Sequence, residues 1–121
     1  MKKRILVIED NPQNLYLAQF LLEKGGYEVG AAQDGFGGIE AARRERPDLI
    51  LLDIQLPGID GYEVMRRIKS MPGLDAIPIV AVTSYAMAGD RDKAFAAGCA
   101  GYIEKPIVPE TFAEQIRRFM S

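Results

Sequence analysis

The chain has 121 residues, a length that favours one domain, and 48% of them are hydrophobic, which is enough to build a layered core. A net charge of −2 argues against a nucleic-acid surface built on bulk positive charge, and the single cysteine excludes an internal disulfide. The absence of histidine excludes catalysis by histidine and metal ligation by histidine. No run of residues has the length of a signal-peptide core or a membrane span, so we expect a soluble cytoplasmic protein without membrane or nucleic-acid partners.

The first half of the chain alternates between strand and helix patterns. An apolar run at Arg4–Ile8 predicts a strand, and Asn11 and Pro12 are typical of the cap and first residue of a helix. That helix is expected to end at Gly25 and Gly26. Residues 27–32 predict a second strand and residues 35–46 a second helix, before Pro47 stops it.

The second half continues the alternation. Residues 48–53 form a short apolar run typical of a strand covered on both faces. Asp60 and Glu63 have the spacing of a capping box, and the helix that they begin is expected to close at Pro72-Gly73. The remaining predicted elements are a strand at 77–82, a helix at 87–97, a strand at 101–103 and a helix opened by Pro109. Five strands alternating with five helices predict a doubly wound parallel sheet in one domain, residues 1–121, without an output domain.

Polar residues follow four of the predicted strands at their carboxyl ends, where ligands bind in open α/β sheets. These residues are Glu9, Asp10, Asp53, Thr83, Ser84 and Lys105. If the strands are neighbours, the three carboxylates converge and raise one another's pKa values. A divalent cation relieves that repulsion, and oxygen ligands suit Mg²⁺.

The set as a whole also suits phosphoryl chemistry. A carboxylate such as Asp53 can attack a phosphoryl group to form an acyl phosphate, while Mg²⁺, the Thr83 hydroxyl and the Lys105 ammonium take up the phosphoryl oxygens. Taken singly, each residue has a plainer explanation. Thr83 can bond its own backbone, and Lys105 can be a solvated surface charge.

The order and spacing of Glu9-Asp10, Asp53, Thr83 and Lys105-Pro106 resemble the response-regulator receiver family over essentially the whole chain. The stretches 52–58 and 77–83 are especially similar to that family, and residues 86–90 resemble single-domain DivK-type receivers. The resemblance implies a flavodoxin-like (βα)5 fold with strand order 2-1-3-4-5. It also implies a phosphorelay switch rather than an enzyme.

The resemblance assigns a role to each matching residue. Asp53 would accept the phosphoryl group from a phosphohistidine on a histidine kinase or phosphotransfer protein. Mg²⁺ would be held by Asp10, Asp53 and the backbone carbonyl of Gln55, with Glu9 supporting it through water. Thr83 and Lys105 would contact the phosphoryl group. Tyr102 would be the aromatic switch that alters the partner-binding face, and Tyr85 and Gln55 would flank the site.

Three alternatives stay open at this point. An aspartyl phosphatase needs a second acid two residues after the nucleophile, where this chain has Gln55. A flavin carrier needs a hydroxyl- and glycine-rich phosphate loop after the first strand, where Glu9 and Asp10 would repel the phosphate. A receiver-like module that binds partners without phosphorylation would be marked by loss of an acid or of Lys105, all of which are present.

Overall fold

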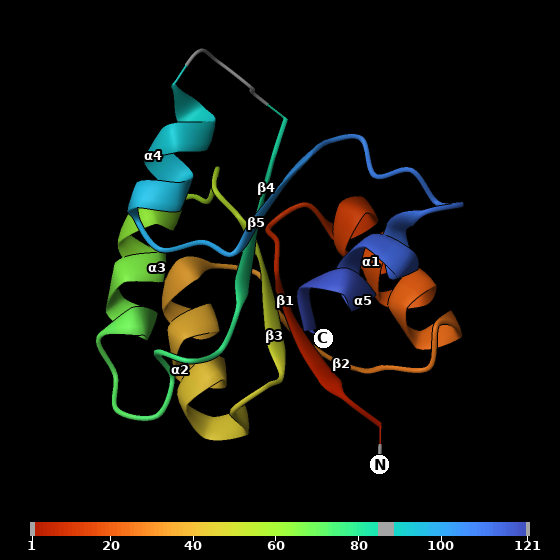
Figure 1. Ribbon diagram of the computed structural model, residues 1–121, viewed down its shortest axis with the longest axis horizontal. Helices are drawn as coiled ribbons and strands as arrows, with labels where there is room; N and C mark the ends of the chain where they lie inside the picture. The colour runs from red at the N-terminus through yellow and green to blue at the C-terminus, as the bar shows by residue number, and fades with distance from the viewer. Residues whose placement is uncertain (1, 85–88, 121) are drawn as a thin grey trace.

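The computed structural model describes residues 2–84 and 89–120. Five parallel strands form one sheet in the order β2-β1-β3-β4-β5, which confirms the predicted fold and strand order (Figure 1). The elements, in chain order, are β1 Arg4–Ile8, α1 Pro12–Lys24, β2 Glu28–Ala32, α2 Gly35–Glu45, β3 Leu49–Asp53, α3 Gly61–Lys69, β4 Ile79–Thr83, α4 Asp90–Ala96, β5 Gly101–Glu104 and α5 Phe112–Met120. Among the described residues, no helix has the length and apolar character needed to cross a membrane.

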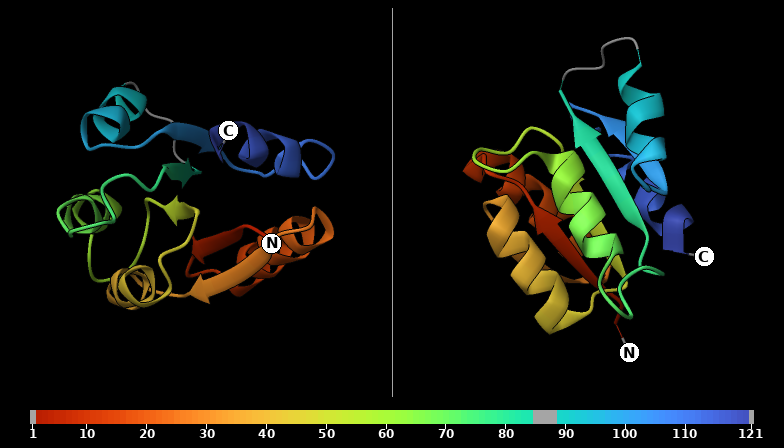
Figure 2. Two further views of the ribbon diagram at one scale, coloured as in Figure 1. Left: turned by 60° about the horizontal axis from the view of Figure 1, so that its bottom comes forward. Right: turned by 90° about the vertical axis from the view of Figure 1, so that its left-hand side faces the viewer.

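The sheet is covered on both faces, so the core has two parts. Helices α2, α3 and α4 pack on one face and α1 and α5 on the other, as the edge-on view in Figure 2 shows. Because successive strand side chains point to opposite faces, even-numbered residues of β3 such as Ile50 join the first part, and odd-numbered ones such as Leu51 join the second. The strands β3 and β4 are buried throughout, which explains their unbroken apolar sequences.

Local signals set the helix boundaries next to the carboxyl edge of the sheet. The Asn11 side chain accepts hydrogen bonds from the N–H groups of Gln13 and Asn14, at 2.9 and 3.0 Å, and so caps α1 as predicted. Asp60 caps α3 by accepting from the Tyr62 N–H at 2.7 Å. The reciprocal half of the predicted capping box is not among the hydrogen bonds of Glu63, whose carboxylate binds Arg66 and Arg67.

Two predicted helix starts were placed too early. The helix predicted from Met87 begins at Asp90, because Gly89 has a φ of +90° and cannot continue a right-handed helix; residues 87 and 88 lie outside the described residues. The last helix begins at Phe112 rather than at Pro109. Pro109 lies instead in a turn that is closed by hydrogen bonds from the N–H groups of Thr111 and Phe112 to the Val108 carbonyl.

The first turn of α3 packs so closely on the loop after β3 that its first residue has to be glycine. A Cβ at Gly61 would lie 2.6 Å from both the Cα and the carbonyl oxygen of Ile54, which are backbone atoms that cannot move aside. Gly61→Ala is therefore expected to lower the free energy of unfolding by about 1–3 kcal/mol in urea denaturation. The matched control is Gly37→Ala near the start of α2, where the neighbouring atom is the side-chain oxygen of Asp34. Equal losses in the two variants would contradict this explanation.

Candidate functional site

The sheet brings the predicted site residues to one edge. The register pairs Ile8 with Leu52, Asp53 with Val82, and Thr83 with Glu104, so the four strands end side by side. One carboxylate oxygen from each of Glu9, Asp10 and Asp53 lies within 4.8 Å of the others. Glu9 and Asp53 are buried and Asp10 is exposed, so the cluster has a buried floor and an open side.

The Lys105 ammonium lies between two of these acids. Its Nζ is 2.6 Å from Oε1 of Glu9 and 3.2 Å from Oδ2 of Asp53. The Lys105 side chain is only 13% exposed, so the plainer explanation of a solvated surface lysine is wrong. Its backbone N–H donates to the Thr83 carbonyl at 2.8 Å, which fixes the segment after β5 against β4. The Lys105–Pro106 peptide bond is cis.

Burial and charge shift the pKa values of Glu9 and Lys105. Burial raises the pKa of Glu9, and the adjacent Asp53 raises it further, although hydrogen bonds from Lys105 and from the Asn11 N–H oppose both. Burial lowers the pKa of Lys105, but the hydrogen bond to Glu9 and the charges of Asp53 and Glu9 outweigh burial, so the pKa of Lys105 is raised overall. The expectation of mutual repulsion among the acids is therefore met at Glu9.

The raised pKa of Glu9 predicts a pH dependence of stability in the presence of a chelator. Just above the ordinary glutamate pKa of 4.5, the folded protein holds a proton on Glu9 that the unfolded chain has lost. The folded state binds more protons there, so the contribution of Glu9 to the free energy of unfolding falls as the pH rises through this window. Urea unfolding at pH values between about 4.5 and 7 is expected to show a smaller fall in Glu9→Gln than in the wild type. Parallel curves for the two proteins would contradict the assignment to Glu9.

The loop after β3 closes one side of the cluster. The Gln55 N–H donates to Oδ1 of Asp53 at 2.8 Å, and the Asn11 N–H donates to Oε2 of Glu9 at 3.1 Å. Ser84 donates its hydroxyl to the side-chain oxygen of Gln55 at 2.8 Å, so the loops after β3 and β4 are joined across the mouth of the site. The sequence placed Ser84 at a strand end but did not predict this contact, since no sequence pattern links positions 55 and 84.

The sequence named two aromatic residues near the site, Tyr102 and Tyr85. Tyr102 lies on β5 and packs, half-buried, against the core under α3 and α4. Its hydroxyl is buried and has no hydrogen-bond partner among the described residues. Tyr85 lies outside the described residues.

The residues present suit a hard divalent cation. Three carboxylates converge, and among the described residues one ammonium is bonded to them, so negative charge remains in excess. Carboxylate oxygens on an open, partly hydrated edge are the ligands that Mg²⁺ prefers. An anionic group bound here would meet the Lys105 ammonium and, if a cation were present, the cation itself.

The fold and the acidic edge are those of a receiver domain, and receiver domains are signalling proteins rather than classical enzymes. Residues 5–117 match the response regulator receiver domain family. The chain belongs to that family, as the sequence resemblance predicted. Receiver domains bind Mg²⁺ at an acidic site and interact with histidine kinases and downstream proteins.

Among individual proteins, the chain is similar to the polar-differentiation response regulator DivK. It is 42% identical to DivK of Brucella anthropi over 120 residues, covering 99% of this chain and 98% of that protein, and 41% identical to DivK of Brucella ovis over the same shares. A solved receiver domain of the sensor histidine kinase PA1611 from Pseudomonas aeruginosa has a magnesium ion in its active-site cleft. It is 34% identical with a TM-score of 0.90, covering 99% of this chain and 98% of that one. The chemotaxis protein CheY4 of Vibrio cholerae is 25% identical with a TM-score of 0.93, covering 98% of this chain and 99% of that one.

Proposed function

We propose that this receiver is a phosphoacceptor switch in which Asp53 takes a phosphoryl group from a phosphohistidine of a histidine kinase or phosphotransfer protein. The observation that carries the proposal is the double hydrogen bond of Lys105 to Asp53 and Glu9 inside the three-carboxylate cluster. An Asp53 oxygen would attack phosphorus and the phosphorus–nitrogen bond of the donor would break. The donor imidazole would leave with the electron pair and the acyl phosphate would remain on Asp53.

The chain's own groups support each part of that reaction. Lys105 stays protonated at neutral pH, because its pKa is raised, and can follow the new phosphoryl oxygens when Asp53 becomes an acyl phosphate. Mg²⁺ would neutralise charge on the phosphoryl oxygens, held by Asp10, Asp53 and the Gln55 carbonyl, with Glu9 acting through water. The receiver thus takes part in its own phosphorylation and dephosphorylation without being an enzyme for another substrate.

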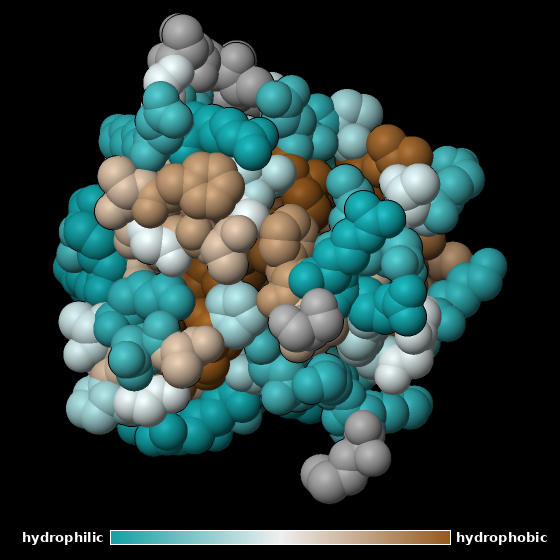
Figure 3. Space-filling view, in the orientation of Figure 1, coloured by the Kyte–Doolittle hydropathy of each residue, from teal (hydrophilic) through white to brown (hydrophobic). Residues whose placement is uncertain are grey.

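The output of the switch is assigned to the face built by α4, β5 and α5. Thr83 is expected to move toward the phosphoryl group, and Tyr102 to change position with it. The same face points toward the viewer in Figure 3, where apolar side chains gather over its centre among hydrophilic ones. A downstream protein would bind there with an affinity that depends on phosphorylation. We also assign the chain to the cytoplasm, since a buried free thiol suits a reducing compartment.

Amide spectra recorded by NMR test this function without knowledge of the partner. Beryllofluoride with Mg²⁺ is the probe, because it mimics a phosphoryl group on a carboxylate. We expect shifts at the end of β4, in β5 and in α4 of the wild type, and none in Asp53→Asn. A wild-type spectrum that does not respond, from a protein that binds Mg²⁺, would contradict the proposal in favour of a receiver-like module that binds partners without phosphorylation.

A further inference from the structure

Helix α4 has few buried side chains of its own. All seven of its residues are described, and only Ala94 among them is buried. Gly89 precedes the helix and supplies no side-chain cap. The aromatic ring of Phe95 is 40% exposed and is covered by Arg91 of the same helix, at 5.4 Å from the guanidinium carbon to the ring centroid. What fixes α4 in place must therefore include contacts to its neighbours.

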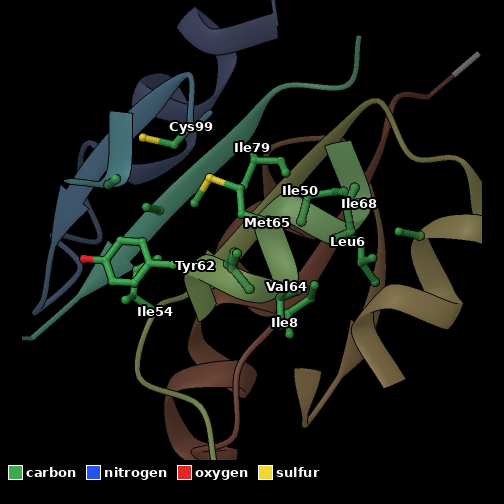
Figure 4. Packing of buried hydrophobic residues seen from close by; sticks show 14 of the residues in the cluster. Leu6, Ile8, Ile50, Ile54, Tyr62, Val64, Met65, Ile68, Ile79 and Cys99 are labelled. Atoms are coloured by element: carbon green, nitrogen blue, oxygen red, sulfur yellow. The ribbon is translucent and has the colours of Figure 1, made fainter. Parts of the chain in front are cut away.

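One such contact joins α4 to α3. The Lys93 ammonium lies 4.4 Å from the centroid of the Tyr62 ring, within the range of a cation–π interaction. Tyr62 is in the first turn of α3 and is 7% exposed, so its ring is fixed by the core, and Figure 4 shows it at the edge of the core cluster on the same side as Cys99. Lys93 itself is exposed, so its ammonium meets the ring at the surface of the protein.

The Lys93–Tyr62 contact lies beside the aromatic residue of the proposed switch. Tyr62, Ala94 and Cys99 belong to one core cluster, and Tyr102 packs against that same cluster. Burial raises the pKa of both the Tyr62 and Tyr102 phenols, and the charge of Asp90, at the start of α4, raises both further.

Thr83 lies on the same face of the sheet. Tyr102 pairs with Ala81 on β4, and Thr83 is two residues further along, so both side chains point toward α3 and α4. The Tyr102 hydroxyl is buried and has no hydrogen-bond partner among the described residues. A movement of Tyr102 that displaces α4 would separate Lys93 from Tyr62.

We propose that Lys93 and Tyr62 form a latch that holds α4 against α3 in the unphosphorylated state, and that Lys93 is a positioning residue for the switch. The claim that the latch is coupled to phosphorylation rests on the proposed function, because the latch opposes the movement of α4 that phosphorylation is expected to favour. Weakening the latch shifts the resting population toward the displaced position of α4.

Hydrogen exchange of the α4 amides in the unphosphorylated protein tests the latch directly. Lys93→Met keeps an unbranched apolar side chain but removes the charge, and we expect exchange of α4 amides to rise about twofold to tenfold. Lys93→Arg, which restores a cation over the ring, is expected to return exchange to the wild-type rate. The matched control is Arg91→Met, which removes the same charge and a cation–π contact that lies within α4 alone.

The role of Tyr62 in the latch is tested by the same measurement of hydrogen exchange. Tyr62→Leu is expected to raise exchange like Lys93→Met, and the double variant is expected to add little, since both changes remove one contact. An unchanged rate in Lys93→Met, or an equal rise in Arg91→Met, would overturn the latch.

Affinity for beryllofluoride in the presence of Mg²⁺ tests the coupling. Lys93→Met is expected to bind the probe more tightly than the wild type by about the factor seen in hydrogen exchange, and Arg91→Met is expected to match the wild type. Faster exchange without tighter binding would overturn the role of Lys93 in the switch. If the wild type itself does not bind beryllofluoride, the proposed function fails, and the exchange experiment still decides whether the latch exists.

Discussion

Asp53→Asn is expected to abolish phosphorylation by small phosphodonors. The amide nitrogen and oxygen that replace the carboxylate are poor nucleophiles, and the substitution also removes one of the three acids that attract a divalent cation. The measurement is chemical trapping: acyl phosphate formed with acetyl phosphate and Mg²⁺ is reduced with borohydride, and the peptide is sequenced by mass spectrometry. We expect homoserine at position 53 in the wild type and unreduced sequence in the variant.

Asp10→Asn is the matched control for this experiment. It removes an acid from the same cluster but leaves the acceptor in place, so it is expected to slow the trapping reaction and to raise the Mg²⁺ concentration that it needs. Homoserine at position 10, or trapping in Asp53→Asn at the wild-type yield, would contradict the assignment of Asp53 as acceptor.

Lys105→Met is expected to cost the protein about 2–4 kcal/mol of its free energy of unfolding at neutral pH when metal is chelated. The variant leaves Glu9 and Asp53 buried at the strand ends without the ammonium that bonds to both. Mg²⁺ is expected to restore part of the loss, because it supplies positive charge to the same carboxylates. Urea denaturation with and without Mg²⁺ measures both effects.

Lys2→Met is the control for Lys105→Met, because it removes a lysine charge from an exposed position before β1. It is expected to change the free energy of unfolding by less than about 0.5 kcal/mol. A similarly small effect in Lys105→Met would mean that its hydrogen bonds to Glu9 and Asp53 contribute no net stability, and would weaken the charge argument for the site.

The fold could be predicted from the sequence because its strands are short, apolar and regularly spaced. The run that became β1 is apolar after Arg4, and those that became β3 and β4 are apolar up to the polar residue at their carboxyl ends, as is typical of strands buried on both faces. The starts of α4 and α5 were placed too early because Gly89 and Pro109 act as turn residues here, and a turn and a first helical position attract the same residue types.

The site was predictable in its members but not in its contacts. Because parallel strands end at one edge, the sequence could bring Glu9, Asp10 and Asp53 together and add Lys105. It could not show that the Lys105 ammonium binds two of these acids, nor that Gln55 and Ser84 bond across the mouth, because side-chain direction depends on the folded loops. The roles of these residues in phosphoryl transfer and metal binding, and those of Thr83, Tyr102 and the Gln55 carbonyl, stay predictions.

Intact-mass spectrometry after incubation with acetyl phosphate tests the central claim most directly. The wild-type protein is compared with and without Mg²⁺, the second sample containing a chelator. We predict a gain of one phosphoryl group that requires Mg²⁺, because the three-carboxylate cluster repels an anionic donor until a cation is bound. No gain in a folded protein that binds Mg²⁺, or an equal gain in the chelated sample, would contradict this account of the site.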